Sequence, residues 1–116
     1  MLPIHPQLES LARAASFSAL RHQVLSRNLA NVNTPNYQRE EVAVVSSPGS
    51  AASPRDMDSS GLQVVKDLTP SNRSDGNNVD VDAEIGMLQQ NAMTYQTVMQ
   101  LMASQLDTMR RAMDGS

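Results

Sequence analysis

The residues of this chain whose types and spacing best suit chemistry are three alternating carboxylates, Asp80, Asp82 and Glu84. Paired carboxylates can act as general acid and base, and clustered carboxylate oxygens can bind Ca²⁺. These three stand at the start of a strongly periodic segment, where Asp80 is suited to cap a helix and acidic side chains complement the positive end of the helix dipole. Because capping explains them without any pocket, we predict that they do no catalysis.

The positions of the histidines and methionines do not indicate a reactive site. His5 stands alone near the N-terminus, and His22 falls on a predicted helix face, either as a packed or interface residue or as a pH sensor. Six of the eight methionines lie in the last third of the chain, which has no histidine and no acid between Glu84 and Asp107, and this favours packing over metal binding. There is no cysteine, zinc-ligand spacing, phosphate loop or Ser-His-Asp order. We therefore predict a non-enzyme with no catalytic residue, no metal and no cofactor.

The composition limits the classes of partner. The 116 residues carry a net charge of −3 with no basic face, which argues against nucleic acid, and nothing indicates a small-molecule substrate. With one Phe, two Tyr and no Trp, the core is thin and a monomer would be marginally stable. The start "MLPIHPQLES" lacks the features of a cleavable signal, and no apolar run is long enough to span a membrane. If the protein leaves the cytoplasm, we expect a route without signal cleavage.

A helix is predicted from about residue 6 to residue 31, because apolar residues recur there at intervals of four and three. A second, smaller apolar patch falls almost opposite the first, so this helix needs neighbours on two sides. The predicted packing residues of the two patches are Leu8, Leu11, Ala15, Phe17, Leu20, Val24, Leu25 and Leu29.

A second helix is predicted from Asp80, its N-cap, to Met113, with a length of roughly 50 Å. No charged residue occurs between Glu84 and Asp107, although a solvated helix face usually carries Glu and Lys. We expect the apolar seam and much of the back of this helix to be covered, either in an intramolecular helical hairpin or in a polymer. The seam repeats every four and three residues, as in a coiled coil: Val81, Ile85, Leu88, Ala92, Tyr95, Met99, Met102, Leu106, Met109 and Met113.

The middle of the chain differs in composition. Its Ser- and Pro-rich part "SSPGSAASP" is typical of a solvated loop, with contact to peptidoglycan or an adjacent subunit as the alternative, and short Val-rich runs at 42–45 and 62–68 suggest a small β-hairpin. The fold class is therefore all-α, with long terminal helices packed as an α-helical hairpin or coiled coil around a short irregular insert. We assign 1–37 to the first helix and its turn, 38–78 to a flexible insert, and 79–116 to the heptad helix, together one axial domain.

The stretch "NVNTPNYQ" ends the first helix in an unusual way. Pro35 lacks an N–H group and disfavours the α conformation at Thr34, so the helix must stop before it. The sequence from Thr34 to Tyr37 fits a type II turn in which Asn36 takes the positive φ. Asn31 and Asn33 are suited to cap the free carbonyls of the helix or to form hydrogen bonds with their own backbone. The result would be a rigid exit that fixes the position of Tyr37.

This turn carries a resemblance. The sequence "LSRNLANVNTPNYQ" resembles the N-terminal signature of the flagellar basal-body rod and hook family, roughly N-x-A-N-x-x-T-P-G-Y. One position departs from it, Asn36, where the family usually has Gly, and Asn tolerates the same conformation. The stretches "DGNNVDVDAE" and "NAMTYQ" are most similar to the proximal rod subunit of that family, more than to the C-type rod protein. The matching residues are Asn28, Ala30, Asn31, Thr34, Pro35 and Tyr37.

The resemblance implies a structural function. Members of this family are exported unfolded by the flagellar type III apparatus and polymerise through their terminal helices into the periplasmic rod, which transmits torque and surrounds the export channel. The implied partners are copies of the chain, other rod subunits, the rod adaptor protein, the membrane (MS) ring and the export gate. The alternative is a cytoplasmic coiled-coil adaptor or regulator that binds one partner helix. That alternative predicts charged residues at positions flanking the seam, and this helix has almost none.

Overall fold

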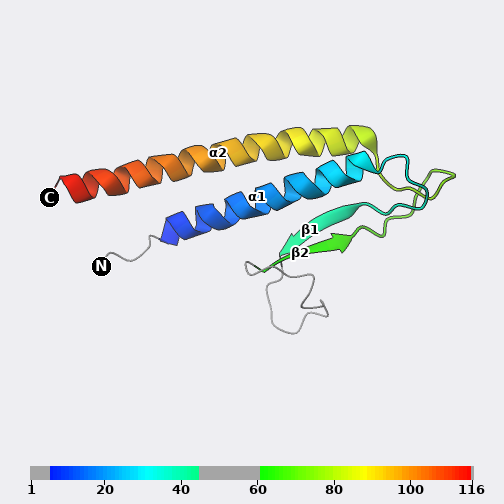
Figure 1. The fold of residues 1–116 in the computed structure, drawn as a ribbon, viewed down its shortest axis with the longest axis horizontal. Helices are drawn as coiled ribbons and strands as arrows, with labels where there is room; N and C mark the ends of the chain where they lie inside the picture. The colour runs from blue at the N-terminus through cyan, green and yellow to red at the C-terminus, as the bar shows by residue number, and fades with distance from the viewer. Residues whose placement is uncertain (1–5, 45–60, 116) are drawn as a thin grey trace.

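The computed structural model describes residues 6–44 and 61–115, and these form two long helices and a two-stranded antiparallel sheet. Helix α1 (Pro6–Ala30) and helix α2 (Val81–Asp114) run antiparallel and side by side, joined through strands β1 (Glu40–Val44) and β2 (Leu62–Lys66). Figure 1 shows the sheet beside α1, on the side away from α2. The predicted fold class, a helical hairpin with a small β-hairpin in the insert, is confirmed.

Helix α1 is the central layer because it has packing surfaces on two sides. The apolar patch predicted opposite its main face contacts the sheet, where Phe17, Leu20 and Val24 pack with Val42 and its neighbours Leu62 and Val64. On its other side, the carbonyl of Ser18 accepts a hydrogen bond of 2.8 Å from Asn91 of α2. The two apolar patches seen in the sequence therefore correspond to two different neighbours.

The strands pair in one register, with Val42 opposite Val64 and Glu40 opposite Lys66. Opposite charges at the open end of the ladder and β-branched residues in its middle both favour antiparallel pairing. The first strand begins slightly before the Val-rich run predicted at 42–45, and Val45 lies outside the described residues. The Ser- and Pro-rich stretch between the strands also lies outside them.

The molecule is long and flat, measuring 66 × 33 × 15 Å. Its radius of gyration of 18.2 Å exceeds the about 13 Å expected for a compact domain of this length. The described residues bury few apolar side chains, namely Val24, Leu25, Val42, Leu62, Val79 and Val98. Within the described residues, neither α1 nor α2 is long and apolar enough to cross a membrane. With so little apolar core, the position of the helices depends on polar contacts at one end.

Candidate functional site: a polar joint between the helices

The turn after α1 has the geometry that its sequence predicts. Asn36 has a φ of 62°, and the amide of Tyr37 donates a hydrogen bond of 3.3 Å to the carbonyl of Thr34. The Asn31 side chain donates to the carbonyl of Arg27 at 2.8 Å and accepts from the Thr34 hydroxyl at 3.1 Å. The turn is therefore braced by its own side chains and directs Tyr37 back toward the helix.

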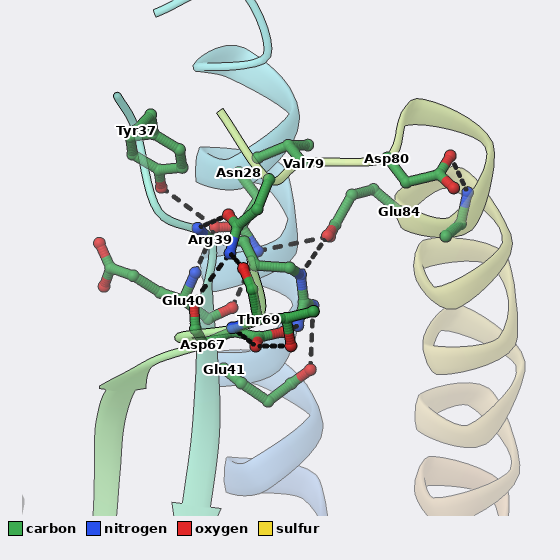
Figure 2. A network of polar contacts seen from close by, with 12 residues as sticks. Asn28, Tyr37, Arg39, Glu40, Glu41, Asp67, Thr69, Val79, Asp80 and Glu84 are labelled. Carbon is green, nitrogen blue, oxygen red and sulfur yellow. Dashed lines mark hydrogen bonds and ion pairs between the residues drawn. The ribbon is translucent and has the colours of Figure 1, made fainter. Parts of the chain in front are cut away.

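Asn28 is fully buried, and the chain that follows the turn packs back against it. Its side-chain amide exchanges two hydrogen bonds with the backbone of Glu40, donating to the carbonyl at 2.8 Å and accepting from the N–H at 2.8 Å. Its oxygen also accepts from the Tyr37 hydroxyl at 3.0 Å, as Figure 2 shows. A carboxamide presents the same donor and acceptor as a peptide group, so Asn28 pairs with the start of β1 as another strand would.

Arg39 joins the sheet to α2 through three carboxylates. Its guanidinium contacts Glu84 at 2.6 Å, Asp67 at 2.9 Å and Glu41 at 3.0 Å (Figure 2). Glu84 is almost completely buried, and its other oxygen accepts from Asn28 at 3.4 Å. Capping therefore explains only part of the acidic triplet. Asp80 is the N-cap, accepting from the amides of Asp82 and Ala83, whereas Glu84 is a buried ion-pair partner.

Two consecutive asparagines attach the segment before α2 to the end of α1. The amide nitrogen of Asn77, which is fully buried, is shared among the carbonyls of Asn31, Val32 and Thr34 at 2.9, 3.0 and 2.9 Å. Asn78 accepts from the backbone N–H of Arg39 at 2.7 Å. The carbonyls that follow α1 thus receive hydrogen bonds from a residue distant in sequence, and those of Asn31 and Thr34 also accept from the backbone of the turn. We call the set Asn28, Tyr37, Arg39, Asp67, Asn77, Asn78 and Glu84 the joint.

Hydrogen bonds and ion pairs at the joint shift the pKa values of Asp67, Arg39 and the adjoining Glu41 toward their charged forms. The pKa of Asp67 is lowered to about 2, first by its hydrogen bonds from the hydroxyl and amide of Thr69 and then by Arg39. Burial acts to raise the pKa of Glu41, but hydrogen bonds from Arg39 and Arg21 outweigh it and the pKa is lowered. Burial likewise acts to lower the pKa of Arg39, while its three carboxylate partners raise it. Burial, and next the charge of Glu40, raises the pKa of Tyr37.

The chemistry of the joint is that of a structural connection. Within residues 6–44 and 61–115, every buried side-chain nitrogen and oxygen has a hydrogen-bond partner, and no group of three or more acidic or histidine side chains is placed to hold a metal ion. A fully satisfied polar network specifies one geometry, because any displacement leaves a buried group unpaired. This arrangement can fix the orientation of α2 relative to α1.

The residues predicted to pack the helices divide between buried and exposed positions. In α1, Val24 and Leu25 are fully buried, and Leu8, Leu11, Ala15, Phe17, Leu20 and Leu29 are half-buried. In α2, Leu88, Met102 and Met109 are half-buried. The other members of the seam are exposed: Val81, Ile85, Ala92, Tyr95, Met99, Leu106 and Met113.

The buried face of α2 does not coincide with the centre of the predicted seam. Its fully buried residues are Glu84, Asn91 and Val98, each one position before a seam residue at 85, 92 and 99. One residue corresponds to a rotation of about 100° around a helix, so α1 covers one edge of the seam and leaves the other edge open. A packing role for the open edge stays a prediction.

The comparisons with known proteins identify the family. No protein-family model matches the chain. It is 29% identical to the flagellar basal body rod protein FlgB of Bacillus subtilis (strain 168) over 127 residues, which is 93% of each chain. It is 28% identical to FlgB of Aquifex aeolicus (strain VF5) over 86% of each chain. With FlgB of Borrelia hermsii it shares 34% identity over 98 residues, covering 66% of this chain and 73% of that one.

The chain belongs to the FlgB family of flagellar basal body rod proteins. The function predicted from its turn, a structural subunit of the basal-body rod, is therefore confirmed, and the cytoplasmic adaptor finds no support. In this FlgB-family chain, the residues that carry the resemblance gather at one place. Asn28 and Tyr37 belong to the joint, and Asn31 and Thr34 brace the turn that leads to it. Ala30, Pro35 and Asn36 are exposed along the same turn.

Sequence reasoning missed the other half of the joint. The sequence pattern assigns no contact to Arg39, Asp67, Asn77 or Asn78, although the two asparagines lie in the stretch "DGNNVDVDAE" that carries part of the resemblance, and it explains Glu84 by the helix dipole alone. One signal was present: Glu84 is the last charged residue before a long uncharged stretch, and Arg39 is the nearest cation after the turn. A lone acid at the edge of an uncharged helix face is a reason to look for a buried cation, since unpaired buried charges are costly.

Proposed function

We propose that this chain is a proximal subunit of the flagellar rod, which polymerises through its terminal helices, transmits torque and lines the export channel. The observation that carries the proposal is the exposed apolar edge of α2, on a helix fixed at one end by a fully paired polar joint. Torque transmission needs subunits whose helices cannot swing relative to each other, and the joint supplies that restraint. Polymerisation needs apolar surface that the monomer leaves uncovered, which α2 supplies.

The proposed neighbours are copies of this chain and other rod subunits, together with the rod adaptor protein, the MS ring and the export gate. The proposed location is the part of the rod within the periplasm, reached by type III export without cleavage of a signal. In this proposal the protein is purely structural and catalyses nothing. The exposed edge of α2 from Ile85 to Leu106 carries no charged residue, and this supports the proposal because an uncharged helix edge suits burial between subunits better than exposure to water.

The three-part division of the chain is also part of the proposal. The helical segments 1–37 and 79–116 would form the axial layer of the rod, and 38–78 would serve as the insert between them. Within that insert, strands β1 and β2 cover one side of α1, and Asp67, Asn77 and Asn78 complete the joint. The insert would thus stabilise the helical pair as well as connect it.

The test is deletion of the gene in its source bacterium, with motility scored beside electron microscopy of purified basal bodies. We expect non-motile cells whose membrane rings lack a rod, and full recovery when the intact gene is supplied. A variant with the joint broken, Glu84→Ala, is expected to recover fewer rods than the intact gene, whereas Asp82→Ala, at an exposed position of the same helical turn, is expected to recover them normally. Normal flagella in the deletion strain would contradict the proposal.

A further inference from the structure

The two helices enclose a groove on one side of the hairpin, with a volume of about 400 Å³. None of its lining residues is an acid, a lysine or an arginine, and small side chains at Ala19 and Ala92 keep it open to another backbone. It lies on the side of α2 where the seam is uncovered, since Ala92 and Tyr95 belong to both. Its lining residues are Ser18, Ala19, His22 and Gln23 of α1 and Asn91, Ala92, Tyr95 and Gln96 of α2.

The uncovered edge of α2 continues past the groove as a single row. Ile85, Ala92, Met99, Leu106 and Met113 recur every seven residues, so they form one slowly winding stripe. Their large members are 40% (Ile85), 42% (Met99), 51% (Leu106) and 63% (Met113) exposed. The opposite flank of α2 carries, beside Leu101, the threonines 94, 97 and 108, whose hydroxyls bond to carbonyls of their own helix. The two flanks of α2 therefore differ in polarity.

The last turns of α2 extend beyond the described start of α1. Pro6 and Leu11 lie beside Leu101 and Gln105, so residues 106–114 project past that point, as Figure 1 shows at the red end of the chain. Leu106 and Met113 continue the apolar stripe along this projection. Asp107 forms ion pairs with Arg110 at 3.9 Å and with Arg111 at 2.9 Å, and Asp114 brings the net charge of this end to zero. The projecting end thus exposes apolar side chains and carries no net charge.

We propose that the projecting end of α2 in one copy lies in the groove of a second copy, with Leu106 and Met113 packed against Ala19, Ala92 and Tyr95. An uncharged groove and an apolar helix end with no net charge are complementary, and both occur on every copy of the chain. The contact joins two different surfaces, so it can repeat head to tail from copy to copy and build a ring or an open helical filament. The inference rests on the proposed function and specifies the contact by which rod subunits would meet.

A matched pair of charge substitutions tests the groove. Ala92→Glu places a charge in the groove, and Thr97→Glu places the same charge at an exposed position on the opposite flank. Each gene replaces the native one in its source bacterium, and rods are counted in purified basal bodies. We expect Ala92→Glu to abolish rods and Thr97→Glu to leave their number unchanged, with equal helix content in the two purified proteins. Normal rods from Ala92→Glu would overturn the inference.

Disulfide cross-linking tests the occupant, and the absence of native cysteine makes the result unambiguous. In a chain carrying both Ala92→Cys and Met113→Cys, the two positions lie about 31 Å apart on one helix and cannot bond within a copy. Oxidation of isolated basal bodies is expected to give a ladder of linked copies. The control chain with Thr97→Cys and Met113→Cys is expected to stay unlinked.

The outcomes separate this inference from the proposed function. Intact rods that give no ladder with the 92–113 pair, or equal ladders with both pairs, would overturn the groove contact while leaving the rod assignment in place. Disulfides in the control that join position 113 of one copy, substituted Met113→Cys, to the same position of another would mean that the helix ends meet each other, which also overturns it. If the 92–113 pair itself prevents assembly, the comparison of Ala92→Glu with Thr97→Glu decides.

Discussion

At the scale of single residues, the fold is stabilised by side-chain amides that form the hydrogen bonds a backbone peptide group would form. Asn28 donates to and accepts from the backbone of Glu40 as a residue of a neighbouring strand would, and Asn77 donates to carbonyls of the turn that follows α1. Both tasks require a carboxamide, because a carboxylate cannot donate. The joint is thus sensitive to changes of single atoms, which a purely apolar contact would tolerate better.

Replacing Asn28 with Ala should lower the free energy of unfolding by about 2–3 kcal/mol, because it leaves the backbone of Glu40 and the hydroxyl of Tyr37 buried without their partner. Asn33→Ala, the same change at an exposed position of the turn, should cost less than about 0.5 kcal/mol. Urea denaturation of the purified chain measures both. Equal effects of the two substitutions would show that Asn28 contributes no more than a surface residue.

The carboxylates of the joint should make stability depend on acid pH. The pKa of Asp67 is 3.8 ordinarily and about 2 in the fold, so its ionised form stabilises the folded chain above about pH 4 and this contribution is lost as the pH falls toward 2. The lowered pKa of Glu41 acts in the same direction. The urea midpoint should therefore fall over this range, and fall less in Asp67→Asn and in Thr69→Val. Parallel curves for all three proteins would refute the assignment.

At the scale of elements, the turn after α1 and the loop before α2 fit together at one glycine. Gly76 has a φ of 79°, and a β-carbon there would lie 2.5 Å from the side-chain oxygen of Asn36. The amide of Asn36 also donates to the carbonyl of Asp75 at 2.8 Å. The residue that replaces the usual glycine of the family signature is thus accommodated by a glycine on the facing loop.

Gly76→Ala should cost about 1–3 kcal/mol of stability, from the positive φ and from the clash with Asn36. Adding Asn36→Gly should restore part of the loss, since it removes the clash but not the backbone strain. Gly86→Ala is the control: it lies in α2 with nothing near its β-carbon, so it should stabilise the chain by about 0.5–1 kcal/mol. Thermal unfolding measures all three. Purely additive effects of the substitutions at 36 and 76 would disprove the contact.

The elements were largely predictable from sequence, whereas their contacts were not. Spacings of four and three gave both helices nearly to the residue, and Pro35 with Asn36 gave the turn, because these signals act between near neighbours. The joint pairs residues up to 56 positions apart, such as Asn28 with Glu84, and no local pattern encodes that distance. The heptad row showed that α2 has an apolar stripe but not which edge of it meets α1, because Glu84 and Asn91 are polar residues in buried positions.

At the scale of the whole molecule, burial is concentrated toward the joint. Among the described residues, the fully buried side chains of the helices fall between Ser18 and Asn28 in α1 and between Glu84 and Val98 in α2. The far ends of both helices bury no complete side chain. Since local stability follows local burial, the helices should resist local unfolding near the joint, the closed end of the hairpin, and unfold locally more easily at their far ends, the open end.

Amide hydrogen exchange measured on the dilute chain and on assembled rods should show this gradient. In the dilute chain, exchange should be slowest at 18–30 and 81–98 and fastest at 6–14 and 101–114, because the open ends lack buried contacts. Assembly should slow exchange most in 101–114, where Leu106 and Met113 gain cover, and least around Asn28 and Glu84, which are already buried. The gain is measured segment by segment, so the closed end serves as the internal control. Uniform protection in the dilute chain would mean that the open ends are stable without a partner. It would contradict the prediction that assembly stabilises them.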